Sequence, residues 1–331
     1  MVTNSIPNRQ RLIELWKVVF IRVGALPFIL VGILVIFGVW NPAFLSSGNM
    51  FMVSRSATYL IVVTLGQMLA LLSGGLDLSV GGSITLISVV SAMVMVALKA
   101  YPGVDVFVGV LTGIGVGALV GATNGYLIAY RRIAPFIATF AMGSIANGVC
   151  LIITGGGLPI FGVPGSFVGT LGRGEVLGVS VPIIVTILLV GVMYFILSWT
   201  RFGRYIYALG GSREAAHVMG IPIRRYTFLT YVIVGILVGL AGVMLLARTG
   251  AGEVTLGLEM PLLSIAAAVL GGVSLFGGEG KLYGAVLGAV AIILLRVGMD
   301  MARIGSFVQM AAVGVVLVIA LALEEYRRRL R

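Results

Sequence analysis

One carboxylate, Asp77, stands among glycines in an otherwise apolar stretch, LLSGGLDLSVGGSI (residues 71–84). Glycine pairs flank it at Gly74–Gly75 and Gly81–Gly82. A carboxylate in apolar surroundings is costly unless hydrogen bonds, water or a cation stabilise it. Asp77 could cap a helix that begins near Leu78 at an interface with water, line a wet cavity where glycines break a helix, or pair with a basic residue. We expect it to support the break structurally.

The other reactive side chains are too few to form a catalytic or metal site. The chain has one histidine, His217, and one cysteine, Cys150, so no His/Cys cluster exists for a metal ion. No Walker A motif occurs; the nearest string, GGEGKL, lacks the glycine five positions before Gly280, and a leucine follows Lys281. We therefore expect no catalytic residue, no metal and no cofactor held by this chain.

The composition of the chain is typical of a membrane protein. Hydrophobic residues make up 60% of the 331 and charged residues only 10%. Soluble domains carry about 25% charged residues, so most of this chain cannot face water. The apolar runs have the roughly 20-residue length that a helix needs to cross a bilayer, and they are apolar on every face. The sequence therefore predicts an all-α, polytopic membrane helix bundle, a single domain over residues 1–331.

Ten spans are predicted, and the basic residues orient them. With the N-terminus inside, sixteen of the 22 Lys and Arg residues fall on the cytoplasmic side and six outside, as the positive-inside rule requires. Both termini are therefore predicted to be cytoplasmic, and the net charge of +11 needs no nucleic-acid partner. The first span is interpreted as retained, not as a cleaved signal. The spans cover about 23–40, 53–72, 82–98, 106–130, 133–153, 179–199, 226–247, 259–271, 282–296 and 306–323.

The few polar residues inside the spans are candidates for a permeation path. Gln67 and Asn124 are the preferred candidates, with Asp77 beside them at the break. Neutral hydroxyl and amide groups suit a neutral, hydroxyl-rich solute. Each can equally hold two helices together. The other polar span residues are Thr64, Ser83, Thr85, Ser88, Ser91, Thr139, Ser144 and Asn147.

The most polar internal segment, residues 200–225, contains a predicted short helix, SREAAHVMG. Ser212 is a plausible N-cap, Glu214 lies in the first turn and Gly220 ends the helix. A helix this short is unstable alone, so it must dock on the bundle or on another protein. Elsewhere, GIGVGALVGATNG spaces small residues about four apart, which predicts close contact between helices.

Three motifs resemble one family. EAAHVMG resembles the E-A-A-x-x-x-G element that permeases of ATP-binding-cassette (ABC) importers present to their ATPase subunits. SGGLDLSVGGSI and GGVSLFGGEGKLYGAVLGA resemble two further landmarks of the ribose/xylose/arabinose-type permeases. The later Ile and Leu-Pro of the E-A-A element are absent here. The glycines that these motifs mark as structural are Gly74, Gly75, Gly81, Gly271, Gly272, Gly277 and Gly278.

The resemblance implies the membrane subunit of a bacterial inner-membrane importer that works as a dimer with a second permease copy. A cytoplasmic ATPase, which binds ATP and Mg, would dock on the segment, and an external sugar-binding protein would deliver a sugar or related polyol. The residues implied in ATPase coupling are Arg204, Glu214, Ala215, Ala216 and Gly220.

Two other classes remain as alternatives. An ion-driven secondary transporter usually needs several carboxylates within its spans, and only Glu259 joins Asp77 near one. A membrane enzyme would need paired carboxylates or a nucleophile with its base. The sequence does not identify the sugar.

Overall fold

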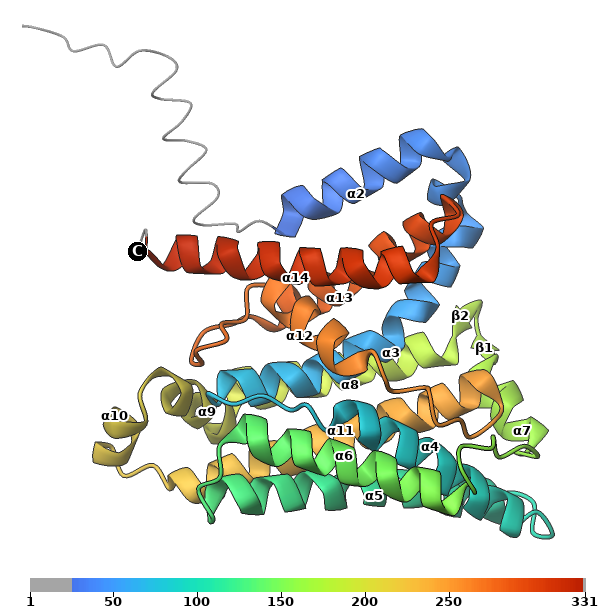
Figure 1. Ribbon diagram of the computed structural model, residues 1–331, viewed down its shortest axis with the longest axis horizontal. Helices are drawn as coiled ribbons and strands as arrows, with labels where there is room; N and C mark the ends of the chain where they lie inside the picture. The colour runs from blue at the N-terminus through green and yellow to red at the C-terminus, as the bar shows by residue number, and fades with distance from the viewer. Residues whose placement is uncertain (1–25, 330–331) are drawn as a thin grey trace, which may run out of the picture.

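The computed structural model describes residues 26–329, and it is a bundle of helices with almost no sheet (Figure 1). Among the described residues, seven helices are long and apolar enough to cross a membrane, and three apolar helices are shorter. The seven are α3 (Ser47–Leu72), α4 (Val80–Ala97), α5 (Val104–Ala129), α6 (Pro135–Ile153), α8 (Val181–Trp199), α11 (Ile223–Thr249) and α13 (Leu282–Met301). The shorter ones are α2 (Leu26–Trp40), α12 (Met260–Leu270) and the first part of α14 (Ser306–Arg329).

The predicted all-α membrane bundle is confirmed, and each predicted span falls on one of these helices. The largest differences in boundaries are at the end of α14, which reaches Arg329, and at the start of α3. α3 begins at Ser47 because Ser46 caps it by accepting a hydrogen bond from the amide of Asn49. The number of crossings and the cytoplasmic location of both termini stay predictions. The start of the first predicted span and the basic residues before Leu26 lie outside the described residues.

The remaining elements lie at the two ends of the bundle. At one end are α9 (Arg201–Gly211) and α10 (Arg213–Val218). At the other end Figure 1 shows α7 (Gly165–Phe167) and the hairpin of β1 (Glu175–Val176) and β2 (Val179–Ser180). The strands are antiparallel, with Glu175 opposite Ser180 and Val176 opposite Val179. Two short helical turns complete the chain, η1 (Pro42–Leu45) and the π-helix η2 (Val168–Gly172).

Helices α3 and α11 form the centre of the bundle. Within the apolar window of each, 89% of α3 and 72% of α11 is buried, against 22% for α6 and α8. The outer helices expose large apolar side chains, such as Phe140 of α6 and Phe195 of α8. Exposed apolar surface of this extent is unfavourable in water, but it is what lipid solvates.

The bundle is built from two halves that run in opposite directions. In the first, α3 is followed by an extended segment, residues 73–79, and then by α4, α5 and α6. In the second, α11 is followed by residues 250–259 and then by α12, α13 and α14. We call these two segments the first break and the second break. Figure 1 shows α3 and α11 running in opposite directions, and it shows each break turning back into the bundle before the next helix begins.

The halves interlock, because α5 packs along α11 and α13 packs along α3. The α5–α11 contact is made by glycines, as the spacing of small residues predicts. A Cβ atom on Gly117 would lie 2.8 Å from Cα of Gly239, and one on Gly121 would lie 2.9 Å from Cα of Gly235. Backbone therefore packs directly on backbone here, which no larger residue permits.

The α5–α11 contact gives a direct test of the packing. Gly121→Ala places a methyl group against the carbonyl oxygen of Tyr231, so we expect the free energy of unfolding to fall by about 1–3 kcal/mol. Thermal unfolding of the purified protein in detergent would show a lower Tm. The matched control is Gly115→Ala on the same helix, where nothing lies within 4 Å of the new methyl. Because Ala favours a helix over Gly by about 0.5–1 kcal/mol, this control should leave the Tm unchanged or raise it. An equal fall in both variants would contradict the packing.

Candidate functional site

Side chains from three helices pair with the backbone of the first break. When the Gln67 amide is oriented to satisfy both of its polar atoms, its nitrogen donates to the carbonyl oxygen of Asp77 at 3.0 Å, and its oxygen accepts from the Asp77 amide at 3.3 Å. Thr139 of α6 accepts from the amide of Leu78 at 3.1 Å. Tyr231 of α11 donates to the carbonyl oxygen of Leu76 at 3.3 Å. Backbone groups that a helix would have satisfied internally are thus paired by side chains.

Asp77 is buried, with 2% of its surface exposed, and it acts on the turn into α4. Its Oδ1 accepts hydrogen bonds from the amide of Ser79 at 2.8 Å and from the Ser79 hydroxyl at 2.6 Å. Asn124 of α5 then donates to the same hydroxyl at 2.9 Å. These hydrogen bonds form a turn before α4 and are not a helix cap, because the N-cap position of α4 is Ser79 and its side chain makes no capping bond. The capping arrangement also placed Asp77 at an interface with water, whereas the side chain is buried within the protein. The choice among the three arrangements stays a prediction.

Gln67 and Asn124, the preferred path candidates, are both fully buried and both point at the first break. Within the described residues, Oδ1 of Asn124 has no hydrogen-bond partner. The structure brings these two side chains together with Asp77, and their place in a permeation path stays a prediction. Sequence reasoning missed Ser79 and Tyr231. The Asp-x-Ser spacing of an Asx-turn could have found Ser79, whereas Tyr231 lies in an apolar run that gives no signal.

The second break meets the first turn of α4 inside the bundle. A Cβ atom on Gly81 would lie 2.9 Å from the carbonyl oxygen of Gly257 and 3.1 Å from the Pro261 ring. Two backbone hydrogen bonds join the second break to the segment before α7. The amide of Ile160 donates to the carbonyl oxygen of Gly252 at 2.9 Å, and the amide of Gly252 donates to the carbonyl oxygen of Ile160 at 3.0 Å. Glycines therefore let the second break approach the first turn of α4, directly after the first break.

An ion pair stands at the start of α12. Arg296 of α13 contacts Glu259 at 2.7 Å, with 32% and 50% of the two side chains exposed. The sequence placed Glu259 at a span boundary and Arg296 outside the membrane. The pair joins α13 to the residue that precedes α12, as Asp77 joins the first break to α4.

The two helices at the opposite end from the β-hairpin form an angled element that we call the elbow. α9 was not predicted; it forms because Thr200 caps it and because Gly203, Ile206 and Leu209 recur every three residues to give it a buried face. α10 is the predicted short helix. Ser212 accepts from the amide of Ala215 at 3.2 Å, and Glu214 lies in the first turn.

α10 buries one side chain against the rest of the protein. Ala216 is fully buried and packs in a small apolar cluster with Leu209 and Ile221. Gly220 has a φ of +74°, a conformation that glycine adopts without strain, and it ends the turn after α10. The rest of α10 faces solvent: Arg204 beside it, Glu214 and Ala215 are exposed, and so are Val218 and Met219, at 87% and 65%. Two exposed apolar side chains next to a carboxylate are typical of a protein contact surface.

The third motif packs beside the second motif and the end of α9. Gly271 at the end of α12 is pressed against the backbone of Gly284 in α13, and Gly272 has a φ of +81°. Gly277 and Gly278 reach the end of α9. Two motifs that are far apart in the sequence thus meet each other and the end of α9 at the elbow end of the first break.

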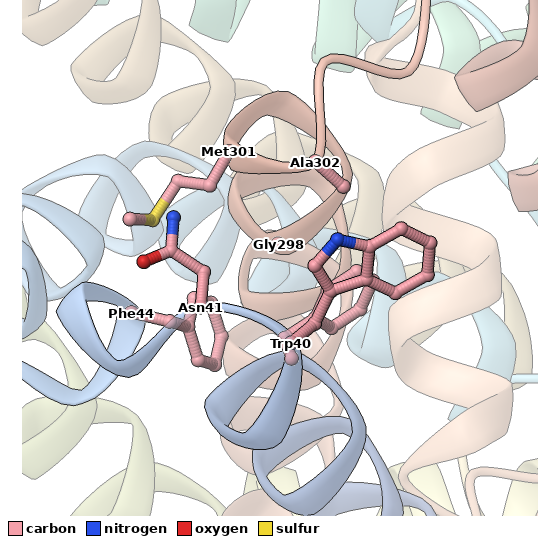
Figure 2. A pocket seen from close by; sticks show the side chains of 7 residues that line it. Trp40, Asn41, Phe44, Gly298, Met301 and Ala302 are labelled. Carbon is pink, nitrogen blue, oxygen red and sulfur yellow. The ribbon is translucent and has the colours of Figure 1, made fainter.

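The other features carry less chemistry. Cys150 is buried and free, and His217 is exposed in the last turn of α10. The residues that the structure describes contain no group of three potential metal ligands. Figure 2 shows a crevice between α2, η1 and the end of α13. It is too narrow to hold a water molecule, so it is not a binding site for a solute. Its lining residues are Phe37, Trp40, Asn41, Phe44, Gly298, Met301 and Ala302.

Comparison with known proteins connects this arrangement to transport. A family described as "Branched-chain amino acid transport system / permease component" matches residues 49–321. The chain is 36% identical over 300 residues to the ribose import permease protein of Bacillus subtilis, covering 90% of this chain and 91% of that protein. It is 33% identical to the D-allose transport system permease protein of Escherichia coli (90% of each chain).

It is likewise 33% identical to the L-arabinose ABC transporter permease protein of Azospirillum brasilense, covering 88% of this chain and 84% of that protein. No solved structure matches the chain. With its apolar helices, the protein is a multi-pass protein of the bacterial inner membrane. The chain belongs to the family of ABC-importer permease components that includes these ribose, allose and arabinose permeases.

Proposed function

We propose that the protein is the membrane subunit of an importer that moves a sugar or related polyol into the cell and is driven by ATP hydrolysis on a partner subunit. The observation that carries this proposal is the elbow. A six-residue helix whose sequence resembles the ATPase-contacting element projects from the bundle, and Glu214, Val218 and the following Met219 are exposed. ATP and Mg would be bound by the partner.

The substrate class rests on the relatives. Those named for ribose, allose and arabinose share about a third of their residues with nearly the whole chain. The family description names branched-chain amino acids, but the relatives with such coverage favour a sugar. A neutral polyol needs hydrogen-bonding groups and no counter-charge.

The ion-driven alternative has less support. Within the described residues, the buried carboxylates are Asp77 and Asp105. Asp105 accepts from the amides of Gly103 and Val106, and so caps the start of α5. Asp77 is engaged by Ser79. Both therefore serve local structure, whereas a proton or sodium relay needs carboxylates free to exchange a cation.

Three partners complete the proposed assembly. The ATPase subunit docks on the exposed surface of α10. A sugar-binding protein docks at the opposite end, where residues 154–180 form the hairpin and α7. A second permease copy packs against an outer helix face, and the sugar path opens alternately to each side of the membrane.

The two breaks are the proposed moving parts. Helices that stop inside a bundle can shift as short rigid pieces about their non-helical junctions. In this mechanism Asp77 sets the shape of the first break and does not contact the sugar.

The coupling assignment is tested at Glu214 and Gly220. Glu214→Lys reverses the charge on the exposed first turn of α10, and Gly220→Val forces a β-branched residue into a left-handed conformation. We expect both variants to insert into the membrane normally, to lose co-purification of the ATPase subunit and to lose ATP-dependent uptake of ribose, allose and arabinose. Glu175→Lys makes the same charge change on β1 and should retain the ATPase. Retained co-purification in both test variants would reject the assignment.

The role of Asp77 is tested by two substitutions. Asp77→Asn keeps an oxygen that accepts from Ser79, so uptake by the complete importer should be retained. Asp77→Ala leaves the buried Ser79 amide without its acceptor and should lower the free energy of unfolding by about 1–3 kcal/mol. Thermal unfolding and sugar uptake measure the two effects. Loss of uptake in a stably folded Asp77→Asn protein would show that the charge itself is required.

A further inference from the structure

Three backbone segments meet without side chains at the elbow end of the first break. They are Gly210–Gly211 at the end of α9, Gly74 at the start of the first break, and Gly277–Gly278 in the loop before α13. We call this contact the glycine junction. A Cβ atom on Gly277 would lie 3.0 Å from Cα of Gly74 and 2.8 Å from the carbonyl oxygen of Gly210.

Gly210 is the centre of the glycine junction. A Cβ atom there would overlap the carbonyl oxygen of Leu72, the last residue of α3, and the amide nitrogen of Gly278. Its neighbour Gly211 differs, because a Cβ atom there would meet nothing within 4 Å. One of two adjacent glycines is therefore required by contact, and the other is not.

Hydrogen bonds hold the same three segments together. The amide of Gly278 donates to the carbonyl oxygen of Leu72 at 3.1 Å. The hydroxyl of Tyr207, on α9, donates to the carbonyl oxygen of Gly280 at 2.9 Å. Burial raises the pKa of the Tyr207 phenol, so it remains protonated and able to donate. α9 is thus tied both to the end of α3 and to the loop before α13.

The glycine junction lies on a continuous route from α10 to both halves of the bundle. α10 is separated from α9 by Ser212 alone, and Ala216 packs against Leu209 of α9. Gly74 begins the first break, which Asp77 and Ser79 connect to α4. The Gly277–Gly278 segment leads into α13 of the second half. A displacement of α9 must therefore displace the first break and the Gly277–Gly278 segment, because backbone in direct contact leaves no flexible side chain to absorb the movement.

We propose that Gly210 is a positioning residue for transport. Through its close contact with Leu72 and Gly278, it transmits movement of the elbow to the first break and to α13, and so converts ATPase movement into opening of the sugar path. This inference rests on the proposed function. The competing explanation is that Gly210 serves only static packing. In that case a folded Gly210 variant would transport normally, whereas our proposal expects it to transport poorly.

The experiment uses the complete importer, with its ATPase subunit and binding protein, in vesicles. The probe is whichever of ribose, allose and arabinose the wild-type importer accumulates, and the readout is sugar accumulated per ATP hydrolysed. In Gly210→Ala we expect the ATPase to co-purify and hydrolysis to continue, while this ratio falls by about tenfold or more. In the matched control Gly211→Ala the ratio should stay within about twofold of wild type.

A milder variant covers the case in which Gly210→Ala does not assemble. Tyr207→Phe removes only the hydrogen bond to Gly280, so the protein should fold and the ratio should fall by about two- to fivefold. An unchanged ratio in an assembled Gly210→Ala importer, or in Tyr207→Phe when Gly210→Ala fails to assemble, overturns the inference. A wild-type importer that accumulates none of the three sugars counts against the proposed function instead, so the two failures are distinguishable.

Discussion

A peptide group inside a lipid-embedded bundle must find its hydrogen-bond partner within the protein, because no water is present to replace one. Helices meet this requirement internally, and the first break does not. The amides of its first three residues bond to carbonyls of α3. Backbone groups of residues 76–79 are paired by the side chains of Gln67, Thr139 and Tyr231, and by Asp77 within the break. Gln67, Thr139 and Tyr231 come from three different helices. Several buried polar side chains of a very apolar protein are therefore used where the backbone leaves helical geometry.

Glycine meets the complementary steric requirement. Once a break is held inside a bundle, neighbouring backbones have to approach it closely, and a Cβ atom at Gly81 would collide with Gly257. The same solution recurs between α5 and α11 and at the glycine junction. Contacts of this kind are tight but smooth, which suits a protein whose proposed work requires helices to shift without unfolding.

Much of the fold could be predicted from the sequence. The apolar runs locate the helices because a bilayer sets their length, and the caps at Ser212 and Gly220 locate α10 because local hydrogen bonds decide where a short helix starts and stops. The depth of Asp77 could not be predicted. Its hydrogen bonds to Ser79 are local and look the same at a membrane surface or inside a bundle.

The partners of Gln67, Asn124 and Gly210 were equally out of reach. Asn124 and Gly210 contact residues that are distant in the sequence, and Gln67 contacts a break that turns back into the bundle. The hydropathy of the sequence predicts neither kind of contact. The resemblance of three motifs to one family identified the right segments. That two of these segments touch each other and the end of α9 is visible only in three dimensions.

The packing of helices of one half against helices of the other has a consequence for the biogenesis of the protein. α3, the most buried of the seven long helices, packs on α11 and α13, which are synthesised much later. Until they emerge, the first half has no complete core, and Leu76 lacks the Tyr231 hydroxyl that holds its carbonyl. A nascent chain that has released α3 to α8 into the lipid therefore lacks the contacts that consolidate the bundle. We expect consolidation late in synthesis, because these contacts join the first third of the polypeptide to the last third.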